Sequence, residues 1–428
     1  MNSFLKEQNH VGTLLNRLRI RDSVIMLQET FRPSRRTQPL EYAIRDLAAA
    51  GEELKRKGKH LIGLNYGDPV RYGFDTPPHI KEAMKKAVDA GSNYYGPSAG
   101  LQELREAVAS KERTVSHARI EASDVVITQG VTEAISFLLG AIVNPGDEVL
   151  MPGPCYSPYI VRTKFFEGNP VTYRTIEEKG WAPDLEDLER KITEKTRLIV
   201  IINPNNPTGS VYSKDEVTRI LEIAASHNLP VAADEVYDRL VFDTDFTSAA
   251  SIAGDTPLLG LNGFSKAYLM TGWRLGYIYI QDPRGKLKDI WQAIGKMSRL
   301  SLCPSTPTQM AGIAALTGPQ THIPEVVKKL QARRDFALKK LSTIPRLTTA
   351  KPQGAFYLFP KIDLQGTPWK NDREFVSELL QETGVLVVNG SSFDPTYGSS
   401  HFRTVFLADE PTLSEAFDSI EGFIAHHT

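Results

Sequence analysis

The apolar run Leu198-Ile199-Val200-Ile201-Ile202 constrains the fold more than any other stretch of the chain. A strand with one face in water alternates apolar and polar residues, whereas an uninterrupted run indicates a strand that is covered on both faces. Such strands occur in parallel sheets that carry helices on either side. The run therefore predicts the interior of an α/β domain.

The neighbouring segments fit the same interpretation. Further strands are expected at Val125–Thr128, 148–151, 230–234, 258–262 and 274–280, with helical segments between several of them. One helix, ending near His227, should open with Ser213 and Glu216, which form a capping box. Strands separated by helices predict an α/β fold with a mostly parallel sheet.

The pattern changes near residue 295. Helices are expected near 286–300, 306–317 and 323–342, short strands near 355–359, 385–388 and 402–407, and a last helix capped by Thr412 with Glu415. We expect a large domain over residues 69–300 and a smaller α+β domain built from residues 37–68 and 301–428. Residues 1–36 lack the continuous apolar core of a secretory signal, so we expect an N-terminal extension, or a true start of the protein at Met26.

Composition excludes several classes of protein. The net charge of -1 gives no bulk attraction to nucleic acid or to an anionic membrane. Cys155 and Cys303 form no close pair and no HExxH pattern occurs, so neither a disulfide framework nor a metal site is expected. No apolar run approaches the ~20 residues that a membrane span needs. A cytoplasmic protein without nucleic-acid or membrane partners is the expectation.

Lys266 has the most informative surroundings of any polar residue. It lies in Gly263-Phe264-Ser265-Lys266 after an apolar strand, and Gly272-Trp273-Arg274 follows closely. Most lysines are solvated surface residues. An amine that is desolvated beside another cation loses its proton more readily and can form a Schiff base.

Polar residues also follow three other strands. The loop 203–209 comes after the central strand, Asp234-Glu235-Val236-Tyr237 ends the next, and Gly130-Val131-Thr132 joins a strand to a helix. Each has a plain structural explanation as a turn or a cap. However, α/β sheets bind ligands at the carboxyl ends of their strands, and a helix N-terminus suits phosphate. No Walker A or GxGxxG pattern supports a nucleotide cofactor.

Together, PNNPTG at 204–209, DEVY at 234–237 and GFSKAYLMTGWRLGY at 263–277 resemble the fold-type I aminotransferases of class I/II. The resemblance covers residues from about 40 to 423. It implies an aspartate-aminotransferase-like fold, with a mostly parallel seven-stranded sheet flanked by helices in the large domain. It also implies pyridoxal 5'-phosphate as the cofactor and a homodimer with shared active sites.

The resemblance further implies three catalytic residues. Lys266 would hold pyridoxal phosphate covalently and move the proton between the substrate Cα and the cofactor C4′. Asp234 would pair with the ring nitrogen and keep the ring able to accept electrons. Tyr237 and Asn206 would hydrogen-bond the phenolate oxygen.

Other residues would bind the cofactor phosphate, the ring or the substrate. Tyr156 would stack on the ring, Tyr95 would reach the phosphate of the other subunit, and the remaining phosphate contacts would come from Gly130, Val131, Thr132, Ser265 and Arg274. Arg403, with the backbone of Gly67 and the amide of Asn206, would bind the substrate carboxylate, because a planar guanidinium suits that ligand. Many relatives have a serine three residues before the lysine, where this chain has Gly263. That departure leaves the details of phosphate binding open.

Within the family, the segments 40–46, 171–183, 302–304 and 351–363 resemble prokaryotic alanine aminotransferases. The implied reaction converts L-alanine and 2-oxoglutarate to pyruvate and L-glutamate. One site must then accept a methyl and a carboxylate side chain in turn, and a fixed buried arginine would be left unpaired with alanine. We hypothesise that a mobile Arg45, with Tyr42, covers the site when glutamate binds; an ordinary surface salt bridge of Arg45 is the alternative.

Three alternatives stay open at this point. The amino acid could instead be aspartate, an aromatic or a branched-chain residue. The cofactor could serve another reaction, as in a C–S lyase or an aminocyclopropane-carboxylate synthase. A transcription regulator with an aminotransferase-like domain is disfavoured, because about 40 residues are too few for a winged helix-turn-helix and a linker.

Overall fold

The computed structural model describes residues 31–38, 40 and 43–428, without the side chains of residues 43–46. The chain divides into two compact units, Met1–Gln38 and Pro39–Thr428. In the first unit, the short helix η1 (Arg35–Thr37) begins after Ser34, whose hydroxyl accepts from the backbone N–H of Arg36. Most of the expected N-terminal extension, 1–36, lies outside the described residues, and the predicted boundaries within 37–428 stay a prediction.

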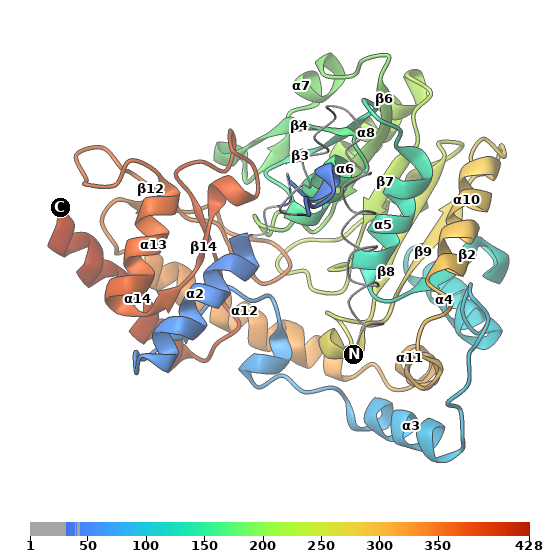
Figure 1. Cartoon of the computed structure of the whole chain (residues 1–428), viewed down its shortest axis with the longest axis horizontal. Coiled ribbons are helices and arrows are strands. Elements are labelled where there is room, and N and C mark those ends of the chain that lie inside the picture. Colours follow the sequence, from blue (N-terminus) through green and yellow to red (C-terminus); the bar gives the residue numbers. More distant parts are fainter. Residues whose placement is uncertain (1–30, 39, 41–42) are drawn as a thin grey trace, which may run out of the picture. The chain divides into compact units, whose positions relative to one another are not determined.

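The second unit is built around an eight-stranded sheet (Figure 1). Its strands, in spatial order, are β2 (Val125–Thr128), β9 (Gly276–Gln281), β8 (Leu258–Gly263), β7 (Val231–Asp234), β6 (Thr196–Ile202), β3 (Glu148–Gly153), β4 (Asn169–Ile176) and β5 (Ala182–Pro183). Only β9 and β5 run against the other six. The sheet is therefore mostly parallel, as expected, but the predicted seven strands become eight because the two-residue β5 pairs with β4.

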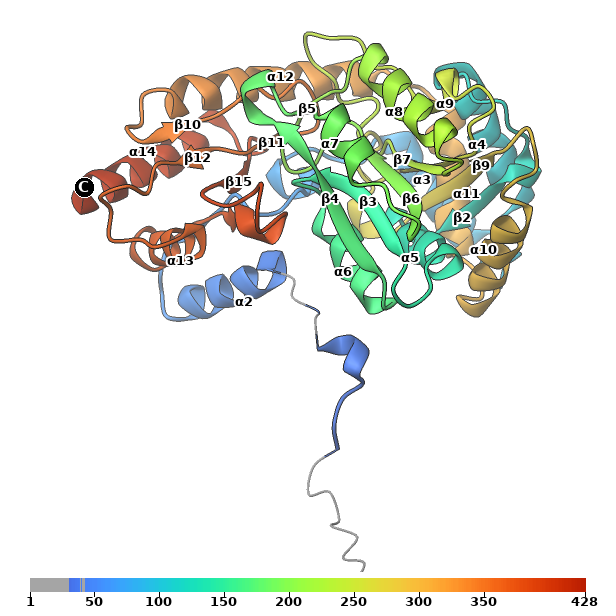
Figure 2. The same cartoon turned by 90° about the horizontal axis from the view of Figure 1, so that it is seen from above.

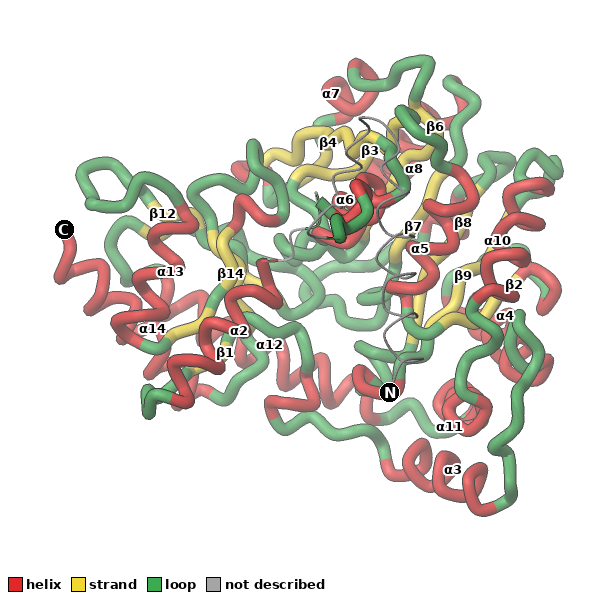
Figure 3. Tube along the Cα trace, in the orientation of Figure 1, coloured by secondary structure: helices red, strands yellow, loops and turns green. Residues whose placement is uncertain are grey.

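Helices cover both faces of this sheet (Figures 2 and 3). One face carries α5 (Val131–Ile142), α6 (Ser157–Phe165) and α10 (Lys288–Leu300). The other carries α3 (Pro78–Asp89), α4 (Gln102–Val115), α7 (Leu185–Arg190), α8 (Lys214–Ser226), α9 (Ala249–Ile252) and α11 (Thr306–Thr317). In β6, Val200 belongs to the core of the first face and Ile199 to that of the second. Burial of both faces explains the uninterrupted apolar run.

A second hydrophobic core gathers segments from both ends of the described chain. The elements around it are α2 (Ala43–Arg56), β1 (Ile62–Gly63), α12 (His322–Leu341), β10 (Leu347–Thr348), β11 (Tyr357–Leu358), β12 (Lys361–Ile362), α13 (Asp372–Thr383), β13 (Val385–Leu386), β14 (Val388–Asn389), β15 (Phe402–Val405) and α14 (Glu410–His427). β15 lies between β11 and β14 in a three-stranded sheet, and β1 pairs in parallel with β13. The remaining short helices are η2 (Pro69–Tyr72), η3 (Ala122–Asp124), η4 (Glu177–Lys179), η5 (Thr271–Trp273) and η6 (Gly390–Ser392).

Two predicted helix caps have different outcomes. The capping box of Ser213 and Glu216 is confirmed at the start of α8. The predicted cap by Thr412 with Glu415 is wrong, because α14 begins earlier, after Asp409, whose carboxylate accepts from the backbone N–H of Thr412. Aspartate is as good an N-cap as threonine, so its position three residues upstream extends the helix by a turn.

The segments that follow four of the strands lie at the same edge of the sheet. β2, β6, β7 and β8 point the same way, so the segments after their carboxyl ends meet at that edge. Those segments begin with Gln129, Asn203, Glu235 and Phe264. In the described part of the chain, no helix has the length and apolar character that crossing a membrane requires.

Candidate active site

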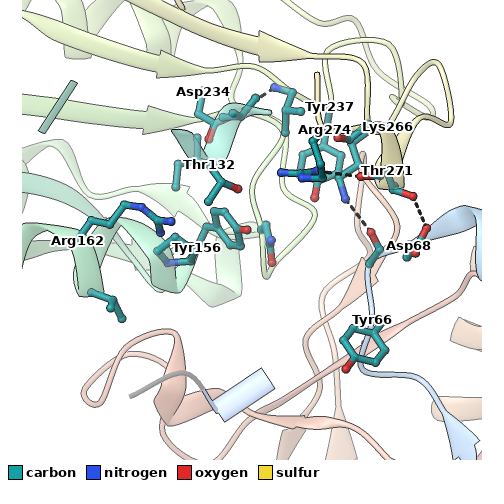
Figure 4. A pocket seen from close by; sticks show the side chains of 18 of the residues that line it. Tyr66, Asp68, Thr132, Tyr156, Arg162, Asp234, Tyr237, Lys266, Thr271 and Arg274 are labelled. Atoms are coloured by element: carbon teal, nitrogen blue, oxygen red, sulfur yellow. Dashed lines mark hydrogen bonds between the residues drawn. The ribbon is translucent and has the colours of Figure 1, made fainter. Parts of the chain in front are cut away.

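A cavity of ≈ 940 Å³ opens at the carboxyl edge of the sheet (Figure 4). Its lining brings together predicted site residues that are far apart in the sequence: Gly67, Val131, Thr132, Tyr156, Asn206, Asp234, Tyr237, Ser265, Lys266, Arg274 and Arg403. The sequence motifs therefore converge on one place. The cavity also contains residues that the sequence did not single out, among them Asp68, Arg162 and Tyr357.

The amine of Lys266 lies among aromatic rings and backbone. Its Nζ donates to the carbonyl oxygen of Gly67 at 2.7 Å and lies 5.7 Å and 5.3 Å from the ring centroids of Tyr237 and Phe356. Burial lowers the pKa of Lys266 to about 8; Arg403 and Arg274 add to the effect, and Asp68 opposes it. A substantial fraction of this amine is neutral near physiological pH, which makes it a nucleophile.

Asp234 ends β7 and is buried. Its Oδ2 accepts from the hydroxyl of Tyr159 at 2.9 Å, and its Oδ1 accepts from the backbone N–H of Val236 at 3.3 Å. Burial raises the pKa of Asp234 to about 6, against the lowering effect of these two hydrogen bonds. A carboxylate held in this way suits a cationic nitrogen, which would restore its ordinary ionisation.

The hydroxyl of Tyr237 lies 2.7 Å from that of Tyr357. Burial raises the pKa of Tyr237 well above its ordinary value, so the hydroxyl keeps its proton and can donate. Asn206 lies in the same cavity, where its Oδ1 accepts from Arg403 Nη1 at 3.0 Å. That bond makes the amide nitrogen of Asn206 the end that can donate to a ligand.

The start of α5 forms a cradle for an anion. Gly130 precedes the helix with φ 80°, and a Cβ there would overlap the guanidinium of Arg274. A Cβ on Gly276 would lie 2.7 Å from the backbone nitrogen of Val131. Helix N–H groups beside an arginine are suited to a phosphate, and the close backbone approach requires glycine at both positions.

Gly263, which stands where many relatives have serine, lies in a tightly packed position. A Cβ there would lie 3.1 Å from the carbonyl oxygen of Leu275 and 3.2 Å from Val131 Cγ2. A larger residue would need these neighbours to shift by a few tenths of an ångström. Ser265, which directly precedes Lys266 in the sequence, lines the cavity and offers a hydroxyl there.

Arg403 is a buried cation, with 2% of its surface exposed. Its Nη2 donates to the carbonyl oxygen of Asn65 at 2.6 Å, and its Cζ lies over the rings of Tyr357 and Phe393, 4.6 Å and 4.8 Å from their centroids. Within the described residues, its Nε is buried and has no hydrogen-bond partner. A buried guanidinium with a spare donor suits a carboxylate ligand.

Four predicted site residues are not placed in the cavity lining, for different reasons. Tyr95 is 81% exposed and is absent from the lining. Tyr42 lies outside the described residues, and only the backbone of Arg45 is described, within α2. Gly130 lies next to Arg274, and its positive φ lets the chain turn into the start of α5.

Sequence reasoning missed two tyrosines that touch predicted residues. Tyr159 follows Tyr156 by one turn of α6, and that spacing was the available signal. Tyr357 belongs to the aromatic segment Phe356-Tyr357, and from the sequence such a segment is equally consistent with a purely structural place in the hydrophobic core. Their roles depend on packing between distant segments.

Comparison with known proteins gives the family. The model of the family described as aminotransferase class I and II matches residues 59–420. The alanine aminotransferase of Mycobacterium tuberculosis is 36% identical over 405 residues, which cover 94% of each chain. The glutamate-pyruvate aminotransferase AlaA of Escherichia coli is 34% identical over 378 residues, covering 87% of this chain and 93% of its own length.

Solved structures agree. The alanine aminotransferase from Pyrococcus furiosus superposes with a TM-score of 0.90 at 48% identity, covering 92% of this chain and all of its own. The aspartate aminotransferase from Thermus thermophilus gives a TM-score of 0.84 at 32% identity, again over 92% and 100%. The chain belongs to the class I and II aminotransferases and is an enzyme that uses pyridoxal phosphate to move amino groups between amino acids and oxo acids.

Proposed function

We propose that this enzyme is an alanine aminotransferase, which converts L-alanine and 2-oxoglutarate to pyruvate and L-glutamate. The observation that carries the proposal is that Lys266 and the buried Arg403 line one cavity, in a chain whose relatives include alanine aminotransferases. The lysine supplies the amine chemistry and the arginine supplies recognition of a carboxylate.

Bound pyridoxal phosphate supplies a ring that accepts the electrons left when the substrate Cα loses its proton. The cradle of Gly130, Val131, Thr132 and Arg274, with Ser265, would hold its phosphate, and the glycines that a Cβ would crowd support that fit. Asp234 would keep the ring nitrogen protonated. Tyr237 and Asn206 would donate to the ring oxygen, and Tyr156 would pack on the ring face.

The residues around the substrate would have two roles, binding of its carboxylate and transfer of the Cα proton. Arg403, with Asn206 and the backbone of Gly67, would bind the α-carboxylate and fix the Cα close to Lys266. Lys266 would take the proton from that Cα and deliver it to the cofactor carbon. Its low pKa supports this role, because a base must be neutral at the working pH.

The test uses the visible absorption of the bound cofactor. L-alanine added without an acceptor should replace the initial band with that of the aminated cofactor, and 2-oxoglutarate should restore it. A band that L-alanine leaves unchanged would contradict the substrate assignment. Glutamate, aromatic and branched-chain amino acids would be tested in the same way.

Aspartate is the second candidate amino acid, because a structural neighbour is an aspartate aminotransferase and a relative is a probable aspartate/prephenate aminotransferase. A faster half-reaction with L-aspartate than with L-alanine would favour it. Release of ammonia and pyruvate without an acceptor would instead indicate a lyase.

The mobile-arginine hypothesis for Arg45, with Tyr42, belongs to this proposal. We expect Arg45→Ala to weaken glutamate and 2-oxoglutarate turnover while sparing alanine; equal losses would contradict it. The cavity holds two further arginines, Arg71 and Arg162. Arg71→Ala and Arg162→Ala are therefore matched controls, and a glutamate-selective loss in either would assign the second carboxylate to that residue.

A homodimer with shared sites is also part of the proposal. Tyr94 and Tyr95 are exposed, as are Leu300, Leu302 and Met310, and Thr306 Oγ1 donates to the Tyr94 carbonyl, which brings the two segments together. Such an apolar surface is typical of an interface. Tyr95 would reach the partner's phosphate site. A cytoplasmic location stays a prediction.

Subunit mixing tests this arrangement. Lys266→Ala and Tyr95→Ala dimers should each be nearly inactive. If Tyr95 serves the partner's site, a mixed dimer has one site with both defects and one intact site, so mixing should restore activity. No recovery after verified subunit exchange would contradict shared sites.

A further inference from the structure

Tyr357 lines the cavity and lies close to Tyr237, Arg403 and Gly67. It belongs to β11, which pairs antiparallel with β15, the strand that carries Arg403. Its hydroxyl is 2.7 Å from the hydroxyl of Tyr237, and its ring centroid is 4.6 Å from Arg403 Cζ. A Cβ on Gly67 would overlap its hydroxyl. One side chain therefore touches groups proposed to hold the cofactor and groups proposed to hold the substrate.

The two hydroxyls form a directed pair once a ligand is bound. Each hydroxyl has one proton to donate. If Tyr237 donates its proton to the ring oxygen of the cofactor, which rests on the proposed function, its own oxygen is left to accept from Tyr357. A hydroxyl that accepts a hydrogen bond becomes a stronger donor, because successive hydrogen bonds polarise one another.

We propose that Tyr357 is a positioning residue that acts on the cofactor through the hydroxyl of Tyr237 and on the substrate carboxylate through the guanidinium of Arg403. Its hydroxyl performs the first role and its ring performs the second.

The packing around Tyr357 supports the first role. Tyr237 and Tyr357 are buried, and their rings meet edge to face with centroids 5.8 Å apart at 86°. Phe356 packs against both rings, at 5.4 Å and 4.8 Å. Burial raises the pKa of Tyr237, with Tyr357 contributing, so the hydroxyl of Tyr237 keeps its proton and can donate. Rings packed on several sides hold the hydroxyls at a fixed separation.

The ring of Tyr357 supports the second role. The guanidinium of Arg403 lies over it and over the ring of Phe393, and its Nη1 is tied to Asn206. A guanidinium that contacts two aromatic faces is attracted to both and loses little entropy when it binds a carboxylate. Removing one face would allow the guanidinium to tilt away from its ligand.

The first experiment removes only the hydroxyl. In Tyr357→Phe, we titrate the visible band of the bound cofactor against pH without any amino acid. Donors to the ring oxygen favour the unprotonated form of the covalently bound cofactor, which places more negative charge on that oxygen. The midpoint should therefore rise by about 0.5–1 pH unit, and the cofactor dissociation constant should rise about threefold. An unchanged midpoint would overturn the role of the hydroxyl.

The second experiment removes the ring. Tyr357→Leu should show the same midpoint shift and, in addition, about tenfold weaker amino-acid binding, while Tyr357→Phe should change that binding less than about twofold. Equal amino-acid affinity in the two variants would overturn the role of the ring.

The matched control is Tyr173→Phe. Tyr173 is fully buried, and its hydroxyl donates to the carbonyl of Val200 in β6 at 3.3 Å. Like Tyr357→Phe, the Tyr173→Phe variant loses one buried hydroxyl, so a general loss of stability would affect both variants. A midpoint shift in Tyr173→Phe as large as in Tyr357→Phe would show a general effect and overturn the proposal. The titration needs no substrate, so it still tests the role of Tyr357 if the enzyme proves to prefer an amino acid other than alanine.

Discussion

The amine of Lys266 donates a hydrogen bond to the carbonyl oxygen of Gly67, 2.7 Å away. The lysine follows β8 in the large sheet, whereas Gly67 follows β1, which pairs with β13. The bond therefore joins the loop that carries the reactive amine to the segment proposed to hold the substrate carboxylate.

The pH dependence of cofactor capture should report the pKa of Lys266. Only the neutral amine attacks an aldehyde, so capture of pyridoxal phosphate by the protein without cofactor should accelerate as pH rises and level off above about pH 8. Stopped-flow absorbance gives the rate. Asp68 raises the pKa of Lys266, so Asp68→Asn should move the midpoint to lower pH. A midpoint near that of free lysine, about 10.4, would contradict the buried environment.

Replacing Gly67 by alanine should disable the site and leave the fold largely intact. The new Cβ would overlap the Tyr357 hydroxyl and lie 3.0 Å from Phe356 Cε2, so both rings must move. We expect kcat/KM to fall by about 100-fold or more, since small misplacements at reacting groups have effects of that size. Gly295→Ala in α10, with nothing within 4 Å, is the control and should keep full activity.

Arg403→Lys should weaken binding of every amino and oxo acid. Lysine keeps the charge but cannot hold Asn206, Asn65 and a carboxylate with one planar group. We expect KM to rise by roughly 10- to 100-fold for alanine and 2-oxoglutarate alike, in line with a lost charged hydrogen bond. Arg284→Lys, at an exposed pair with Asp255, should have no effect. Unchanged KM values would place the carboxylate elsewhere.

A buried ion cluster around Lys111 should matter for stability. Lys111 Nζ contacts Asp238 Oδ2 at 2.7 Å and Glu112 Oε1 at 2.9 Å, and Asn262 Nδ2 donates to Asp238 at 3.0 Å. Burial disfavours the charge on Lys111, but the two carboxylates outweigh it and raise the pKa of Lys111.

Lys111→Met would leave two buried carboxylates without their cation. We expect a loss of about 3–5 kcal/mol in the free energy of unfolding, measured in urea. Lys340→Met, which breaks a surface pair with Asp418, should cost less than about 1 kcal/mol. Equal losses in the two variants would show that burial of the cluster has no special effect.

The sequence predicted features that depend on local pattern. The buried run of β6 identified the sheet, and the motifs around Lys266, Asp234 and Asn206 identified residues that share a cavity. These predictions succeeded because parallel strands bring their carboxyl ends together whatever the details of packing.

Other features depended on contacts that no local pattern contains. The hydrogen bond of Tyr159 to Asp234 requires the rotation of α6 against the sheet, and the contact of Tyr357 with Tyr237 joins segments 120 residues apart. The α14 cap was misplaced because Asp409 and Thr412 are both good caps, and only the helix geometry distinguishes them.

The position of β2 has a consequence for synthesis of the chain on the ribosome. Among the described strands, β2 lies at the sheet edge and pairs with β9 alone, which is made roughly 150 residues later. At about 5–20 residues per second, the nascent strand waits on the order of 10–30 s for its partner. Gly276, at the start of β9, packs against the backbone of Gly130, so the turn after β2 gains this neighbour only once β9 has emerged.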